Sequence, residues 1–466
     1  MPIDSAKIKN LDQLDKISTF IEDFYIHDSS LIYLDGNSLG RLPKETITDI
    51  NDFMLNEWGD QLVNGWENWI NEAQISGDLL AENVLGAKKG EALVCDTTSV
   101  NFYQLCSAVI KLNPGRKTII TDAANFPTDR YVLEGIADTF DLKLVVIDNE
   151  EIDAKDYERI TPDLIRPYLN NDIALATFQV LQYRSGALNP MREITSLIRE
   201  YDCLTVWDAS HAAGSVNLDF AKNNIDLAVG CTYKYLCSGP GSPAYLYVKK
   251  SLQKKLQVPI QGWFAQKDQF EMGPKFIKSE DIRGFQIASP SILGLRCVNA
   301  AIKIINKASI PEIVKKAQKG TDIMIEFYDQ WLKSLGYKLM TPRDKNKRGG
   351  HISIMHENAR IISVALRNFE NVIVDYRKPN QIRIAMSPLT TSFSELYEGL
   401  KKIRYVTENK TFEKIKGFDE KKNYSESGII NRKSGELVHE VTREIKSETP
   451  EKDITFYNCT EKNRVV

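Results

Sequence analysis

The chain has 466 residues, of which 42% are hydrophobic and 26% charged, and its formal net charge is −3 at pH 7. This composition is that of a globular protein, and the length suffices for two domains because single cores rarely grow beyond about 250–300 residues. The small net charge gives no basic surface for nucleic acid and no apolar run is long enough to cross a membrane, so we expect neither partner. The seven cysteines form no CxxC pair and the N-terminus lacks a secretion signal, which favours free thiols in a cytoplasmic protein.

The first 90 residues are predicted to be mostly helical. Their apolar residues recur at a spacing of three or four and predict a helix over residues 6–26: Leu11, Leu14, Ile17, Ile21 and Phe24. A glycine-containing loop at residues 35–40 follows, and a long helical region is expected over residues 44–85. Tryptophans in that region are more typical of a core than of a ligand site: Trp58, Trp66 and Trp69.

Between residues 92 and 230, short apolar runs alternate with helical stretches. The predicted strands cover residues 92–95, 118–121, 144–147, 173–177, 203–207 and 227–230. This alternation predicts the α/β class, with a mainly parallel central sheet covered by helices. Hydroxyl residues at positions 97–99 open one of the helices, where they can cap it or bind a phosphate group.

Two polar residues stand at the ends of predicted strands. Asp208 follows the run 203–207, and Lys234 follows the run 227–230. In open α/β sheets this edge carries the ligand chemistry. Enzymes that use pyridoxal phosphate need a lysine that binds the cofactor covalently and a carboxylate that keeps its pyridine nitrogen protonated. The pair therefore indicates a pyridoxal phosphate site.

The C-terminal half follows a different pattern. Residues 249–286 have no clear period, residues 290–335 are predicted to be helical, and strands at 351–355, 372–374 and 382–386 with a helix at 394–405 predict a smaller α+β domain. In the last strand, alternation places Ile382 and Ile384 on the core face and Arg383 on the other face, pointing out of the core. His351 and His356 are predicted to lie on opposite faces of a strand, which counts against a metal pair.

These patterns predict two domains and an extension. The large cofactor-binding domain is expected to cover residues 36–299, and the small domain residues 1–35 and 300–408. Residues 409–466 are rich in charge and are expected to form an extension that stays flexible, with a short amphipathic helix at 435–446.

Seven motifs in this order make the chain similar to one known family. The chain resembles the kynureninases, fold-type-I pyridoxal phosphate enzymes related to class V aminotransferases, through LDGNSLG (34–40), TTSVN (97–101), NFPTD (125–129), WDASHAAG (207–214), YKYL (233–236), GWF (262–264) and IRIA (382–385). The motifs span residues 30–400 and leave the C-terminal extension outside.

The resemblance implies how the cofactor would be bound. Lys234 would carry it covalently, Asp208 would pair with its pyridine nitrogen, and Phe126 would stack on its ring. The further contacts implied at the ring and at the phosphate group come from Pro127, Thr128, Asp129 and His211, and from Thr98, Ser99, Ser185 and Tyr233.

The resemblance also implies a homodimer and a substrate pocket. Trp263 and Ser289 would reach the phosphate group from the partner subunit, although the family more often has asparagine or threonine at the position of Ser289. Arg383 would bind the substrate carboxylate, with Ser38 and Trp66 in the same pocket. Glu67 departs from the family pattern beside the aryl pocket, which leaves the choice between kynurenine and 3-hydroxykynurenine open.

The activity implied is the hydrolysis of L-kynurenine or 3-hydroxy-L-kynurenine to anthranilate or 3-hydroxyanthranilate and L-alanine, a step of tryptophan catabolism and NAD biosynthesis. Lys234, Tyr233 and Asp208 are the expected catalytic residues, with Tyr233 as a proton donor. The alternatives are an aminotransferase, a cysteine desulfurase and a binding protein that keeps the fold. A desulfurase is disfavoured because no cysteine lies between Cys297 and Cys459 and because Tyr233 stands where histidine is usual.

Overall fold

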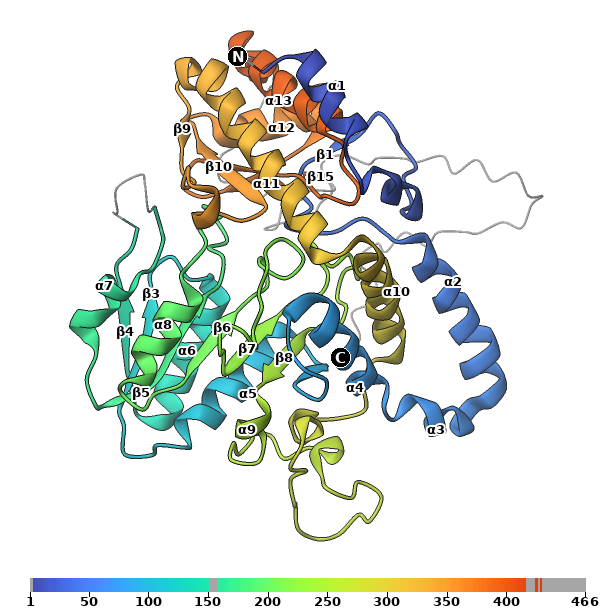
Figure 1. Cartoon of the computed structure of the whole chain (residues 1–466), viewed down its shortest axis with the longest axis vertical. Helices are drawn as coiled ribbons and strands as arrows, with labels where there is room; N and C mark the ends of the chain where they lie inside the picture. The colour runs from blue at the N-terminus through green and yellow to red at the C-terminus, as the bar shows by residue number, and fades with distance from the viewer. Residues whose placement is uncertain (1–2, 151–156, 416–423, 426–427, 430–466) are drawn as a thin grey trace, which may run out of the picture. The chain divides into compact units, whose positions relative to one another are not determined.

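The computed structural model, which describes residues 3–150, 157–415, 424–425 and 428–429, contains a seven-stranded sheet (Figure 1). Its strands lie in the order β2 (Ala92–Val94), β8 (Tyr245–Val248), β7 (Leu227–Gly230), β6 (Thr205–Asp208), β5 (Ile173–Gln179), β3 (Thr118–Asp122) and β4 (Lys143–Ile147). Only β8 runs antiparallel to its neighbours, and the pairs from β7 to β4 are parallel. The predicted mainly parallel α/β sheet is therefore confirmed.

Strand β5, which lies between β6 and β3, is buried along its whole length, as expected for a strand covered on both faces. The helices that follow the strands of this sheet are α5 (Thr98–Ile110), α6 (Pro127–Phe140), α7 (Pro162–Ile165), α8 (Met191–Arg199) and α9 (Lys250–Gln253). Helix α5 contacts β5, β6, β7 and β8, so its N-terminus is held at the edge of the sheet where Asp208 ends β6.

A second sheet of four antiparallel strands lies in the C-terminal part of the fold. Its order is β12 (Asp375–Arg377), β13 (Gln381–Ala385), β10 (His351–Met355) and β9 (Lys338–Leu339). The elements around it are α1 (Ser5–Gln13), α11 (Ile310–Phe327), α12 (Ala359–Glu370), α13 (Phe393–Glu408) and the parallel pair β1 (Ile32–Tyr33) and β11 (Val372–Ile373). These elements match the α+β pattern of the sequence, while the domain boundaries at residues 36 and 300 stay a prediction.

Three predicted helices are wrong in their extent because the backbone breaks. The helix predicted over 6–26 is α1 followed by a 3-10 helix at Ser18–Asp23. The region 290–335 divides at Ser309 into α10 (Ile292–Ala308) and α11. The helix is interrupted there because Ser309 has a φ of 66° and a proline follows at position 311. The region ends in a π-helical turn and a 3-10 turn, at Tyr328–Leu332 and Lys333–Leu335.

The region 44–85 is a chain of short helices rather than one long helix. Leu62, the first residue of a 3-10 helix, has a φ of 51°, which lies outside the right-handed helical region, so a continuous helix is interrupted there. The segments are α2 (Lys44–Asp52), a π-helical turn (Phe53–Gly59), a 3-10 helix (Leu62–Gly65), α3 (Trp66–Trp69), α4 (Glu72–Leu80) and a second π-helical turn (Ala81–Leu85). Shorter 3-10 helices elsewhere lie at Arg166–Tyr168, Trp263–Ala265, Ile282–Phe285, Lys345–Lys347 and Thr411–Lys414.

Residues 1–414 form one compact unit and residues 415–466 a second one. Within the second unit, β14 (Tyr424–Ser425) pairs antiparallel with β15 (Gly428–Ile429), and the helix predicted at 435–446 lies outside the described residues. Thr411 and Phe412 are buried in the first unit, so the start of the predicted extension packs onto the folded core. Among the described residues, no helix has the length and apolar character needed to span a membrane.

Candidate active site

Lys234 lies in the loop after β7, within reach of three of the predicted site residues. Its Nζ is 2.9 Å from Nε2 of His211 and lies 5.9 Å from the ring centre of Phe126 and 5.8 Å from that of Tyr233. His211 is buried, and burial together with Lys234 and Arg383 holds its pKa well below the usual range. The imidazole is therefore neutral, and its Nδ1 has no hydrogen-bond partner among the described residues.

The loop that carries the motif 34–40 packs closely against the lysine loop. The Gly40 N–H donates to the Tyr233 carbonyl at 2.9 Å. A Cβ atom at Gly40 would lie 2.5 Å from the Lys234 carbonyl oxygen and 2.6 Å from Cα of Cys237. A glycine is therefore required at this position, because any side chain would push the two loops apart.

Two carboxyl groups meet beside Lys234. Asp208 ends β6 and accepts the Ser210 N–H at 2.9 Å, while Asp129 stands in the first turn of α6. Burial, and then the neighbouring charge of Asp208, raise the pKa of Asp129 well above its usual range. One Asp129 oxygen is buried without a hydrogen-bond partner among the described residues. Such a pair is suited to a protonated ring nitrogen, which would supply the missing donor and the positive charge.

The first turn of α5 offers free backbone donors. Thr97 caps the helix, and its Oγ1 accepts the Val100 N–H at 3.3 Å. Thr98 and Ser99 follow with partly exposed side chains at the positive end of a 13-residue helix. This arrangement suits a phosphate group.

Ser185 and Tyr233 are the other two residues predicted at the phosphate group. Ser185 is fully buried, its Oγ accepts the Ala187 N–H at 3.2 Å, and its own N–H donates to Glu158. Burial raises the pKa of Tyr233 above its usual value, so the phenol keeps its proton. Pro127 and Thr128 open α6 directly after Phe126, whose ring meets that of Tyr183 edge-on at 5.2 Å.

Arg383 is buried, although strand alternation predicted that it points out of the core. Only 1% of its side chain is exposed, because the face of β13 opposite the isoleucines is covered by the loop 34–40 and by the loop after β5. Its Nε donates to Asp375 Oδ2 at 2.5 Å, Nη1 to the Tyr183 carbonyl at 2.6 Å, and Nη2 to Ser38 Oγ at 2.9 Å. The described residues thus satisfy three of its five N–H groups and leave one on each Nη for a ligand.

Asp375 and Arg377 belong to this cluster and were not predicted. Asp375 stands opposite Arg383 in the β12–β13 ladder, and Arg377 Nε donates to the same carboxylate oxygen at 2.8 Å. Alternation along the sequence of β12 places 375 and 377 on one face, but only the register of the two strands pairs 375 with 383.

His351 is another residue that the sequence left aside. It is fully buried, its ring lies 5.8 Å from that of His211, and burial and Arg383 lower its pKa to about 3. Strand geometry counted against a metal pair of His351 and His356. That argument gave no indication that His351 packs beside the lysine site.

A buried polar network supports the loops that carry Phe126 and Ser185. Asp122 Oδ2 accepts from Asn149 and Gln182, each at 2.8 Å, and burial raises its pKa to about 7. On the other side, Glu158 is fully buried and forms an ion pair of 2.7 Å with Arg184. These residues come from different loops, so only the folded chain brings them together.

Three predicted site residues, Trp66, Trp263 and Ser289, make no contact with the cluster around Lys234 among the described residues. Trp263 is 44% exposed and packs against Phe264 and Phe270, and Ser289 is exposed. Trp66 packs between Trp69 and Phe264, with ring-centre distances of 5.7 and 6.1 Å. Trp263 and Ser289 were predicted to serve a partner subunit, and that role stays a prediction.

The site therefore combines an amine, a pair of buried carboxyl groups, an aromatic ring, a helix N-terminus and an arginine with two free donors. These groups fit pyridoxal phosphate: the unpaired Asp129 oxygen and the unpaired His211 Nδ1 are the kind of buried atoms that a polar ligand satisfies. Lys234 is the only amine in the set.

Comparisons with known proteins agree with this fit. The family model of the kynureninase C-terminal domain matches residues 313–403. A kynureninase from Pseudomonas fluorescens is 32% identical over 412 residues, which cover 86% of this chain and 95% of that protein. A kynureninase from Burkholderia pseudomallei is 31% identical over 411 residues with the same coverage of both chains.

Solved structures show the same fold at low identity. A cysteine desulfurase from Thermococcus onnurineus has a TM-score of 0.73 at 17% identity and covers 84% of this chain and 99% of its own. The cysteine desulfurase CsdA from Escherichia coli has a TM-score of 0.70 at 13% identity and covers 85% and 98%. The architecture is thus that of fold-type-I pyridoxal phosphate enzymes, and the chemistry has to be argued from the site.

Proposed function

The chain belongs to the kynureninase family, and from this premise we propose that it hydrolyses L-kynurenine to anthranilate and L-alanine with pyridoxal phosphate as cofactor. The observation that carries the proposal is the cluster of Lys234, His211, Asp208 and Asp129 next to a buried Arg383 with two free N–H groups. When bound, the cofactor supplies an electron sink for charge that develops at the substrate α-carbon.

Arg383 would bind the substrate carboxylate through the free N–H on each Nη. Asp375 and the Tyr183 carbonyl hold the guanidinium plane from behind, so the two free donors are fixed in parallel and suit a bidentate carboxylate. Ser38 Oγ, which accepts from Nη2 at 2.9 Å, is placed to donate its own proton to the same carboxylate. The substrate would then be oriented before any proton moves.

Lys234 would move the proton at the α-carbon. Its Nζ lies 2.9 Å from the neutral His211 and forms no ion pair among the described residues, so the free amine can act as a base. Asp208, with Asp129 behind it, would keep a proton on the cofactor ring nitrogen. Tyr233, whose phenol stays protonated, would donate near the γ-carbon as the Cβ–Cγ bond breaks. Water supplies the oxygen of the new carboxylate and the hydrogen that completes alanine.

Two finer assignments belong to the same proposal. The chain would act as a homodimer with shared sites, because Trp263 and Ser289 present exposed side chains that a second subunit could use. It would be cytoplasmic, which agrees with six free cysteines among the described residues. Phosphate-site and substrate residues would be those already named: Thr98, Ser99, Ser185, Tyr233, Ser38 and Trp66.

The proposal is tested with purified protein reconstituted with pyridoxal phosphate. The wild type is expected to absorb visible light as a lysine-bound cofactor and to release anthranilate, followed by its fluorescence, from L-kynurenine. Lys234→Ala is expected to lose both signals, and parallel assays with 3-hydroxy-L-kynurenine establish the substrate preference. A protein that cannot take up the cofactor, or that takes it up and forms a keto acid instead of anthranilate, would contradict the proposal.

A further inference from the structure

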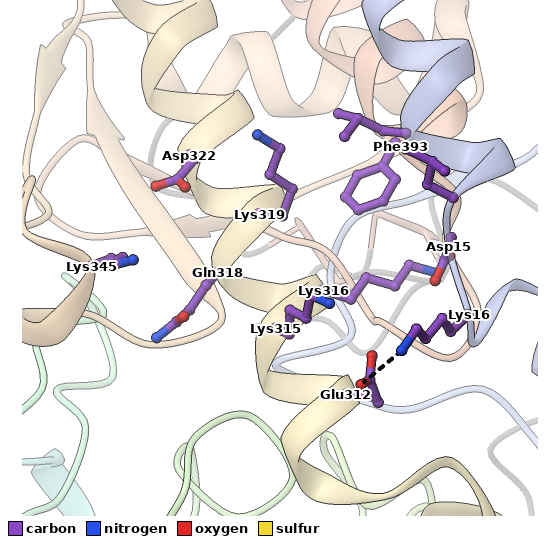
Figure 2. Close-up of a pocket in the computed structure, with 12 residues that line it drawn as sticks. Asp15, Lys16, Glu312, Lys315, Lys316, Gln318, Lys319, Asp322, Lys345 and Phe393 are labelled. Atoms are coloured by element: carbon purple, nitrogen blue, oxygen red, sulfur yellow. Dashed lines mark ion pairs between the residues drawn. The ribbon is translucent and has the colours of Figure 1, made fainter.

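A cavity of about 430 Å³ lies between α1, α11 and the start of α13 (Figure 2). We call it the lysine cavity, and its walls are Leu11, Leu14, Asp15, Lys16, Glu312, Lys315, Lys316, Gln318, Lys319, Asp322, Lys345 and Phe393. None of these residues belongs to the site around Lys234. The volume is within the range of about 300–1,000 Å³ that small-molecule sites occupy.

Positive charge in the cavity exceeds the negative charge that faces it. Five lysines and three carboxylates line the walls. Lys316 is paired with Asp15 at 2.7 Å, and both side chains are only 5% exposed. The looser pair of Lys16 and Glu312, at 3.8 Å, is drawn in Figure 2.

The remaining carboxylate is turned toward a residue outside the walls. Asp322 is paired with Arg348, which is itself almost fully buried. Among the residues that the structure describes, Lys315, Lys319 and Lys345 therefore have no ion-pair partner. Three ammonium groups around one cavity are left for an anion.

Like charges also repel along α11. Lys315 and Lys319 are four residues apart and share one face of the helix with Glu312 and Lys316. Like charges at this spacing destabilise a helix by about 0.2–0.5 kcal/mol per pair. A bound anion would convert this repulsion into attraction.

The neighbouring helix N-terminus cannot serve the same anion. The first N–H groups of α13 already donate to the carboxylate of Asp12, from Phe393 at 2.7 Å and from Ser394 at 3.0 Å. This wall is instead apolar, because the buried Phe393 side chain lines the cavity together with Leu11 of α1 and Leu14, which follows α1. The lysines and the apolar wall favour a ligand with an anionic end and an apolar body.

We propose that the lysine cavity binds a small organic anion, a carboxylate attached to a ring or short chain, with the carboxylate between Lys315, Lys319 and Lys345 and the apolar part against Phe393. The pair of Lys316 and Asp15 forms the floor and stays intact on binding. The site is separate from the proposed active site and does not depend on the proposed reaction.

Titration calorimetry of the full chain loaded with cofactor tests the proposal, with benzoate as the probe. The wild type is expected to bind benzoate more tightly than inorganic phosphate and not to bind benzylamine. Lys315→Gln/Lys319→Gln should weaken benzoate binding by about tenfold, which equals about 1.4 kcal/mol. Lys307→Gln, an exposed lysine of α10 outside the cavity, is the matched control and should bind as the wild type does.

Two further measurements separate this cavity from the site of Arg383, which could also hold a carboxylate. Raising the salt concentration from about 0.1 to 1 M, which shortens the Debye length from about 10 to about 3 Å, should weaken binding in the wild type more than in the double variant. Benzoate should protect Lys315 and Lys319, but not Lys307, from acetylation measured by mass spectrometry. Benzoate binding that is lost in Arg383→Gln and unchanged in the double variant would overturn the proposal, as would phosphate binding as tight as benzoate binding.

Discussion

Replacing Asp375 by asparagine tests how the carboxylate-binding arginine is held. The side chains of Arg383 and Asp375 are 1% and 9% exposed, and the carboxylate oxygen lies 2.5 Å from Nε. Asparagine keeps an acceptor at the same place but removes the charge, so the guanidinium is left buried without its counter-ion. Loss of a charge-assisted hydrogen bond costs about 1.5–3 kcal/mol, and we expect the free energy of unfolding to fall by that amount.

The catalytic effect follows from the same contact. If this free energy is lost in full in the transition state, kcat/KM for L-kynurenine falls by about 10–150-fold, and the larger part of the change is expected in KM. Steady-state kinetics from anthranilate fluorescence and urea unfolding measure the two effects on the same preparation.

Arg377→Gln is the matched control, because this residue donates to the same Asp375 oxygen from a side chain that is 37% exposed. Solvent screening limits exposed pairs to about 0.2–1 kcal/mol, so its effects on unfolding and on KM should be small. Asp375→Asn with wild-type KM and wild-type stability would refute the assignment of Asp375 as the positioning residue for Arg383.

The other predictions concern a proton donor, a buried acid and the end of the folded unit. Tyr233→Phe is expected to keep the visible absorbance of the bound cofactor but to lower kcat by about 100-fold or more, the usual contribution of a general acid. An unchanged kcat would show that Tyr233 takes no part in the proton transfers. Burial raises the pKa of Asp122 from 3.8 to about 7, so the protonated carboxyl stabilises the fold fully below pH 4 and this contribution is lost as the pH rises to 7. Asp122→Asn should therefore flatten the pH dependence of the urea midpoint between pH 4 and 7. An unchanged slope would contradict this assignment. A chain ending at Lys414 is expected to keep full turnover. A chain ending at residue 408 also loses the buried Phe412, and its free energy of unfolding should be lower by about 3 kcal/mol. Equal stability of the two chains would show that Phe412 does not hold the end of the unit.

The parts of the site that the sequence predicted are those held by local motifs. Lys234, Asp208 and the hydroxyls at 98 and 99 stand at strand ends or at a helix start, and the parallel sheet brings such positions to one edge. The order of β6 and β7 as neighbours then places Asp208 and His211 beside the lysine loop.

The parts that were missed depend on contacts between distant segments. Arg383 is buried because a loop near residue 38 and a loop near residue 183 cover its strand, and periodicity along β13 contains no information about either. The helix boundaries near Leu62 and Ser309 were missed for a local reason, since both are non-glycine residues with positive φ that carry no glycine signal.

The most direct test of the central claim is the product balance of the reaction in oxygen-18-labelled water. Hydrolysis of L-kynurenine predicts anthranilate and L-alanine in equal amounts, with one labelled oxygen in the anthranilate carboxylate and none in alanine. Consumption of L-kynurenine without anthranilate, or alanine formed from L-cysteine instead, would contradict the assignment of this site to kynurenine hydrolysis.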